Sequence, residues 1–211
     1  MREKRRVHRA AVLFTIATLH HPAAVFNTPS AHTWTHRVLP LYTPLSHQRT
    51  SLPVLQRHGR WLRVLLPGRP NGHAGWIDGR KATTWSTPWH VVVRTASKRL
   101  FVFKGGRIVR SFPVVVGRAA TPTPHGRFYV EEAIVLPPTT PGAPDAYALS
   151  ARSNVFQEFD GGPGQIAMHG IYGIGGVPGT AVSHGCIRLA DSAVRWLVGR
   201  VGAGTPVTIG N

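Results

Sequence analysis

The alternation of hydrophobic and polar positions predicts a mainly β protein built from short strands. The clearest pattern begins after His90, where Val91–Val93 is a short apolar run typical of a buried strand. Residues Arg99–Lys104 then alternate, and Gly105-Gly106 separates them from another strand-like segment over 107–116. Two glycines between such segments are typical of a tight β-hairpin, so we expect a hairpin here.

The same reading predicts further strands at Arg127–Val130 and Val207–Ile209, and only one helix. That helix covers residues 192–198, with Asp191 as its N-cap and Gly199 positioned to end it.

In the N-terminal half, residues 37–84 contain short apolar pieces separated by turn signals. A Trp61–Leu66 strand, an Asn71-Gly72 turn and a second strand at Gly75–Asp78 follow one another. This order resembles a bacterial SH3-like module, which implies a small N-terminal β-barrel. We expect Trp61 and Trp76 to fill its core rather than to bind a ligand.

Residues 1–30 predict an export leader. Basic residues precede Ala10–Leu19, an uninterrupted apolar run. Ten residues are too few to span a bilayer as a helix, which needs about 20, but they suit a signal peptide. We expect secretion to the cell envelope, with the leader cleaved near Pro29–Ala31, kept as a membrane-proximal anchor, or buried as an N-terminal segment.

Composition adds a strong positive charge, with 25 Lys and Arg against 8 Asp and Glu and a formal net charge of +17. Such a surface attracts polyanions, among them nucleic acid, anionic lipid and phosphate-bearing wall polymers. The alternative is that arginine simply serves as the solvating residue. No nucleic-acid-binding motif accompanies the charge, and export is incompatible with that role, so we expect no nucleic-acid partner.

Candidate chemistry gathers between residues 161 and 189, where two His-Gly pairs flank a glycine-rich segment. His169-Gly170 forms the first pair, and His184-Gly185 the second, directly before Cys186, the only cysteine of the chain. A cysteine nucleophile needs a base and donors for an oxyanion. We expect His169 to be the base and the backbone around Gly185 to approach the substrate, while Arg188 could hold a carboxylate.

Other interpretations of these residues stay open at this point. A lone cysteine is often a small buried apolar residue. His169, His184 and Cys186 could bind zinc, although no usual ligand spacing supports this. A Ser183 nucleophile is also conceivable, but the G-x-S-x-G pattern is absent.

The strings Ile166–Gly170 and Ser183–Leu189 together resemble the active-site signature of the L,D-transpeptidase (YkuD-like) family. The segment Thr121–Phe128 is similar to the family's T-P-x-G-x-F element. The resemblance extends over residues 89–210 and implies an L,D-transpeptidase-type β-sandwich with one short helix.

For this chain the resemblance implies one set of catalytic residues and one set of substrate-binding residues, with no metal and no cofactor. The catalytic residues would be the nucleophile Cys186, the base His169, Gly170, whose carbonyl would orient the imidazole, and His184 and Gly185, which would help shape the oxyanion pocket. The substrate-binding residues would be Arg188, Ser183 and Met168.

The implied partners are peptidoglycan stem peptides, with anionic cell-wall polymers as a further partner of the basic surface. One departure is Ile171, where the family usually has threonine. It leaves open a carboxypeptidase that uses water as acceptor, and a non-catalytic wall-binding protein is the alternative of another class.

Overall fold

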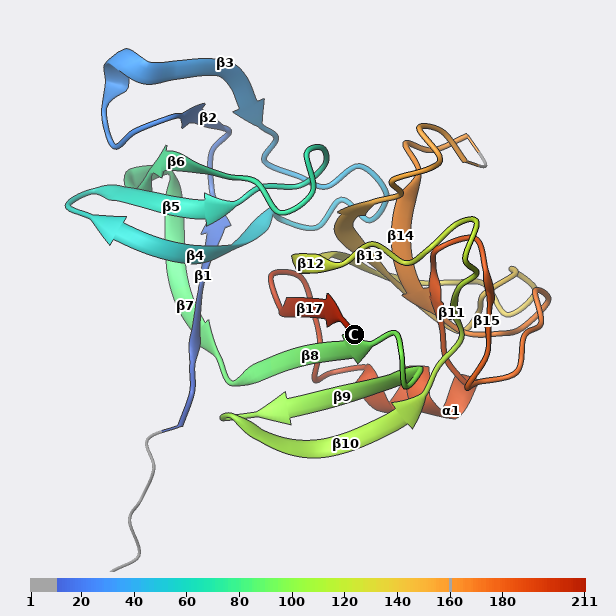
Figure 1. Ribbon diagram of the computed structural model, residues 1–211. Coiled ribbons are helices and arrows are strands. Elements are labelled where there is room, and N and C mark those ends of the chain that lie inside the picture. The colour runs from blue at the N-terminus through green and yellow to red at the C-terminus, as the bar shows by residue number, and fades with distance from the viewer. Residues whose placement is uncertain (1–10, 160) are drawn as a thin grey trace, which may run out of the picture.

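The computed structural model describes residues 11–159 and 161–211 and has two main β-sheets, one from each half of the chain (Figure 1). One α-helix accompanies them in the described residues, together with the 3-10 turns η1 (Ala31–Thr33) and η2 (Gly79–Lys81). The prediction of a mainly β protein with one short helix is confirmed.

The N-terminal sheet has seven strands, and all its pairings are antiparallel. In spatial order they are β3 (Trp34–Leu39), β2 (Ala23–Phe26), β6 (Ala74–Asp78), β5 (Trp61–Leu65), β4 (Ser51–His58), β1 (Phe14–Leu19) and β7 (Ala82–Thr87). Trp61 and Trp76 are buried, as expected of core residues. The unit is larger than the predicted 37–84 module, because three of its strands begin before residue 37.

The apolar run predicted to be a leader forms strand β1, at least from Phe14 onward. Ile16, Ala17 and Leu19 are fully buried, and β1 pairs with both β4 and β7. A short apolar run rich in β-branched residues suits a buried strand as well as a signal peptide, so its pattern does not separate the two. In the described structure this run is a buried strand, and cleavage near Pro29–Ala31 would remove β1 and β2 from the sheet.

The basic residues that precede this run, between positions 2 and 9, lie outside the described residues. Among the described residues, no helix is long and apolar enough to cross a membrane.

The C-terminal sheet has eight strands, and its two parallel pairings are β8 with β17 and β14 with β16. In spatial order the strands are β10 (Arg107–Pro113), β9 (Arg99–Lys104), β8 (Trp89–Arg94), β17 (Pro206–Gly210), β12 (Gly126–Val135), β13 (Asp145–Arg152), β14 (Gln165–His169) and β16 (Ile187–Arg188). A separate parallel pair joins β11 (Val116–Gly117) to β15 (Ala181–Ser183). Gly105 and Gly106 form the predicted hairpin turn, both with positive φ.

One core fills the C-terminal unit. Apolar residues of β8 and β9 join those of β13, β14 and β17, and helix α1 (Asp191–Leu197) adds Ala193, Val194 and Leu197. The helix cap differs from the prediction. Ala190 is the N-cap, and the Asp191 carboxylate accepts a hydrogen bond from the Ile171 N–H at 3.3 Å instead of capping the helix. Helix α1 is thereby tied to the segment that follows His169.

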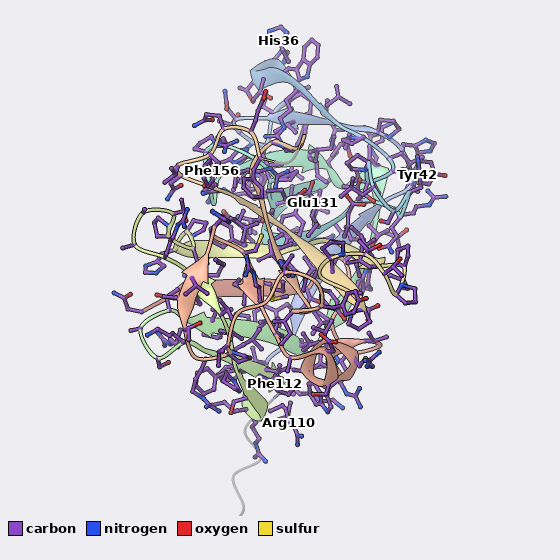
Figure 2. The ribbon with its side chains drawn as sticks, turned by 90° about the vertical axis from the view of Figure 1, so that its right-hand side faces the viewer. His36, Tyr42, Arg110, Phe112, Glu131 and Phe156 are labelled. Carbon is purple, nitrogen blue, oxygen red and sulfur yellow. The ribbon has the colours of Figure 1, made fainter. Side chains whose placement is uncertain are left out.

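The two units share a buried polar interface centred on strand β12. Glu132 has no exposed surface, and its carboxylate accepts hydrogen bonds from the Leu45 N–H, the Ser46 N–H and the Ser46 hydroxyl at 3.1, 2.7 and 2.7 Å. Neighbouring Glu131 lies between the two sheets (Figure 2) and pairs with Arg152 at 3.2 Å. Burial is the main reason why the pKa of Glu131 is raised, and Arg152 opposes the rise. The hydrogen bonds of the buried Glu132 therefore join the two units, while the Glu131–Arg152 pair lies within the C-terminal unit.

We predict that Glu132→Ala lowers the free energy of unfolding by about 3 kcal/mol, because it leaves buried donors of residues 45 and 46 without an acceptor. Urea unfolding followed by circular dichroism measures the loss. Glu158→Ala is the matched control, since it removes the same charge from an exposed position. Equal unfolding midpoints for the two variants would contradict this account of the interface.

Candidate active site

A cleft of about 600 Å³ in the C-terminal unit contains the chemistry-bearing residues predicted from the sequence. His169, His184, Cys186 and Arg188 all line it. The remaining lining residues are Leu136, Pro141, Ala146, Phe159 and Ile174.

The parallel pairing of β14 with β16 brings the two His-Gly segments together. Met168 is in register with Ile187, and His169 with Arg188. Continued by one residue, this register sets Cys186 beside Ala167, two positions before His169. Because side chains alternate along a strand, His169 and Ala167 point to one face and Met168 to the other. The imidazole and the thiol thus reach the same cleft.

The His169 ring is held by the carbonyl of the next residue. Its Nδ1 donates a hydrogen bond to the Gly170 carbonyl at 2.8 Å, and since a carbonyl can only accept, the proton resides on Nδ1. Nε2 therefore carries a free lone pair. Burial lowers the pKa of His169, the Gly170 hydrogen bond opposes this, and the charge of Arg188 adds to the lowering. The imidazole is neutral at neutral pH and can accept a proton.

Gly170 itself has no room for a side chain. A Cβ at this position would lie 1.8 Å from the Ala143 carbonyl oxygen and 2.9 Å from Asp191 Oδ1. The glycine lets the chain pass close to the loop before β13, and this close passage fixes the carbonyl that orients His169.

Burial also governs the Cys186 thiol. It raises the pKa of Cys186, while a backbone hydrogen bond with Ala167 and the charge of Arg188 act in the opposite direction. Because the pKa of the thiol is raised and the pKa of His169 is lowered, both side chains are neutral at rest, and both line the same cleft. Such a pair can pass a proton from sulfur to nitrogen as the sulfur attacks an electrophile.

The backbone before Cys186 is fixed by side chains of two segments. The Ser183 hydroxyl donates to the Cys186 carbonyl at 2.6 Å and accepts from the Gly185 N–H at 3.1 Å. The Thr123 hydroxyl donates to the Gly185 carbonyl at 2.8 Å. Gly185 has φ +125°, and a Cβ there would lie 2.9 Å from the Ile166 side chain. A glycine is therefore required for this turn.

These bonds decide which backbone donors remain for an oxyanion. The Gly185 N–H is already used by Ser183. The N–H groups of His184 and Cys186 make no hydrogen bond to another group in the described part of the chain. They are the candidates for an oxyanion pocket, in place of the Gly185 N–H.

Two residues predicted to bind substrate lie away from the cleft. Met168 is fully buried in the C-terminal core, since it points to the face of β14 opposite His169. Ser183 is also fully buried, and its hydroxyl is engaged within the turn before Cys186. The structure contradicts a direct substrate contact for both, and Ser183 instead shapes the backbone that carries the cysteine.

Arg188 and His184 do line the cleft, each with partners of its own. Arg188 donates to the carbonyls of Ile174 and Gly175 at 3.2 and 3.3 Å, which ties the glycine-rich segment to the cleft. Its Nε is buried and has no partner among the described residues. The His184 ring packs against Phe159, with the ring centroids 5.5 Å apart.

Sequence patterns did not single out several residues that shape the site. Thr121 and Thr123 lie in the T-P-x-G-x-F-like segment, and both hydroxyls donate to carbonyls of the turn before Cys186. Phe156 and Phe159 lie in an irregular loop, where no periodicity marks them. Among the described residues, no group of three or more His, Cys, Asp or Glu side chains is placed to hold a metal ion.

Comparison with known proteins gives the class and then the family. A family model described as "YkuD: L,D-transpeptidase catalytic domain" matches residues 88–209. A protein of Bacillus subtilis (strain 168) named as the L,D-transpeptidase YkuD is 31% identical over 153 residues, which cover 69% of this chain and 84% of the relative. L,D-transpeptidase 1 of Mycobacterium tuberculosis (strain H37Rv) is 28% identical over 192 residues, covering 74% of each chain.

Among solved structures, an L,D-transpeptidase from Mycobacterium smegmatis covers 71% of this chain and 89% of its own, with 18% identity and a TM-score of 0.43. The family match covers more than half of the chain and includes both His-Gly segments. The chain belongs to the YkuD family of L,D-transpeptidase catalytic domains.

The raised thiol pKa gives a testable pH dependence. We predict that alkylation of Cys186 by iodoacetamide is slower at pH 7 than that of the urea-unfolded chain, and that its rate still rises above pH of about 8.5, the ordinary thiol pKa. Because the chain has one cysteine, all labelling reports on this site. A rate that levels off below pH 7 would instead reveal a thiolate paired with an imidazolium and contradict the neutral pair.

Proposed function

We propose that this protein is a peptidoglycan L,D-transpeptidase that forms 3→3 cross-links through a thioester on Cys186. The observation that carries the proposal is the β14–β16 pairing, which brings Cys186 and a correctly protonated His169 to one cleft in a chain of this family. The acyl donor is a tetrapeptide stem, and the acceptor is the side-chain amine of a neighbouring stem.

In the first step, the Cys186 sulfur attacks the carbonyl at the third residue of the stem while His169 Nε2 takes the thiol proton. A carbon–sulfur bond forms, and the carbonyl oxygen becomes an oxyanion near the N–H groups of His184 and Cys186. The intermediate then collapses, the carbon–nitrogen bond to the terminal D-alanine breaks, and His169 returns the proton to the leaving amine.

In the second step, the acceptor amine attacks the thioester and His169 removes a proton from it. The carbon–sulfur bond breaks, the sulfur regains a proton, and the new amide is the cross-link. Two backbone donors suit the oxyanion in both steps, because one such donor in a desolvated site typically contributes about 10²–10³ to the rate. The step draws only on groups of the chain and of the two stems.

Arg188 and the surface charge serve substrate binding in this proposal. The guanidinium of Arg188 lies at the cleft with an unpartnered buried Nε, which suits a substrate carboxylate or carbonyl. The net charge of +17 favours contact with anionic wall polymers. Because peptidoglycan lies outside the membrane, we place the activity at the cell envelope.

A second candidate is an L,D-carboxypeptidase of the same fold, in which water takes the acyl group. It is favoured by Ile171, an apolar residue where the family usually has threonine, in the segment that leads to the Arg188-bound carbonyls at the cleft. A change at the residues that bind the acyl acceptor affects the second step, attack on the thioester, and leaves the first step, formation of the thioester, unchanged.

The test incubates the purified protein with a disaccharide-tetrapeptide and follows released D-alanine and products by mass spectrometry. We expect cross-linked dimer with the unaltered protein. Cys186→Ala should lower the rate by at least about a thousandfold, and His169→Ala by about 10²–10⁴. Both substitutions shorten side chains without adding volume, and circular dichroism is the check that each variant folds.

The other outcomes separate the alternatives. D-alanine release that ends only in tripeptide favours the carboxypeptidase. A folded unaltered protein that releases no D-alanine contradicts the proposal and favours a non-catalytic wall-binding role.

A further inference from the structure

One wall of the cleft is formed by the loop between β13 and β14, which we call the aromatic loop (residues 153–159 and 161–164). Its Phe159 lines the cleft beside His184, and the Phe156 ring lies 6.1 Å from the His184 ring. The two phenylalanine rings are 5.3 Å apart, so the three rings form one aromatic surface. An extended peptide in the cleft would pack against it.

Phe159 is not fixed by burial. About half of its surface (48%) is exposed, and it belongs to neither hydrophobic core. Its position must come from the backbone of the loop. A loop held by few contacts samples several conformations, and ordering it on ligand binding costs conformational entropy.

The N-terminal unit supplies the contacts that hold this backbone. Arg69, in the connection between β5 and β6, donates to three loop carbonyls: Ser153 at 2.9 Å, Phe156 at 2.7 Å and Pro163 at 3.0 Å. These carbonyls come from both ends and the middle of the loop. One guanidinium thus closes the loop at its base, using the fork geometry that lysine lacks.

Asn71 makes a second contact from the same connection. Its side-chain amide donates to the Arg152 carbonyl at 2.7 Å and accepts from the Arg152 N–H at 2.8 Å, directly before the loop begins. Gly68 adds a backbone bond from its N–H to the Ser150 carbonyl at 3.2 Å. Figure 2 shows Phe156 beside the N-terminal half of the molecule.

We propose that Arg69 is a positioning residue through which the N-terminal unit holds the aromatic loop in place for the stem peptide. The inference deepens the proposed function and rests on it for the identity of the ligand. Arg69 acts on peptide binding through Phe156 and Phe159 and leaves the thiol–imidazole pair unaffected, because its contacts are confined to the loop.

The test measures binding of a disaccharide-tetrapeptide by calorimetry in the Cys186→Ala background, where no turnover occurs. Arg69→Ala should raise Kd about fivefold, the loss expected when one set of charged hydrogen bonds no longer orders the loop. Arg69→Lys should recover part of the affinity. Arg57→Ala, an exposed arginine on β4 of the same unit, removes the same charge and should leave Kd unchanged.

Two further readouts separate positioning from general damage. With Cys186 present, Arg69→Ala should alkylate with iodoacetamide at the unaltered rate. Phe159→Ala should also raise Kd, and the Arg69→Ala, Phe159→Ala double variant should lose less affinity than the sum of the two single losses, because Arg69 acts in part through that ring.

Equal Kd values for Arg69→Ala and Arg57→Ala would overturn the inference, as would fully additive losses in the double variant or a matching loss of thiol reactivity. If only Arg69→Ala shifts Kd and the unaltered protein never releases D-alanine, the inference about Arg69 stands. The proposed transpeptidase reaction is then overturned. Absence of any peptide binding in the Cys186→Ala protein would overturn the inference.

Discussion

A short stretch of parallel β-structure holds the candidate active site together. The pairs Met168 with Ile187 and His169 with Arg188 join a strand that ends at His169-Gly170 to a strand that begins just after His184-Gly185 and Cys186. Shifting this register by one residue would turn His169 into the core and Met168 into the cleft, because side chains alternate along a strand. The buried Met168 on the opposite face therefore helps to keep His169 where it is.

Hydrogen bonds and a close backbone contact hold the segments on either side of this pairing. The Gly170 carbonyl fixes the imidazole, and the close passage at Gly170 leaves that carbonyl no alternative position. Ser183 and Thr123 fix the turn that precedes Cys186. Burial disfavours charge on both His169 and Cys186, so the cleft favours a neutral pair, and the backbone N–H groups of His184 and Cys186 remain for charge that develops in the proposed reaction.

The sequence could predict which residues line the cleft better than it could predict where the N-terminal unit begins. The strings around His169 and Cys186 predict two reactive side chains, and the structure places both at one cleft. This was accessible because the resemblance to the family signature lies in the residues of these strings themselves. The hairpin at Gly105-Gly106 could also be predicted from the sequence, since only glycine easily takes two successive positive φ values. Strand β1 could not be predicted, because a ten-residue apolar run is typical of a signal peptide and of a buried strand alike.

Other features depend on contacts that no local pattern encodes. Met168 and Ser183 adjoin the motif residues in sequence but point away from the cleft, which only the register reveals. The link from Arg69 to the aromatic loop joins residues more than eighty positions apart. The sequence predicts Asp191 as a helix cap, but its carboxylate instead accepts a hydrogen bond from the N–H of Ile171, twenty residues away.

The most direct measurement is to trap the enzyme during turnover with acid, digest it, and locate the acyl group by peptide mapping. Our account predicts a tripeptide-stem thioester on the peptide that contains Cys186, removed by hydroxylamine. Products that accumulate while this peptide stays unmodified, or an acyl group on any other residue, would contradict a reaction that passes through Cys186.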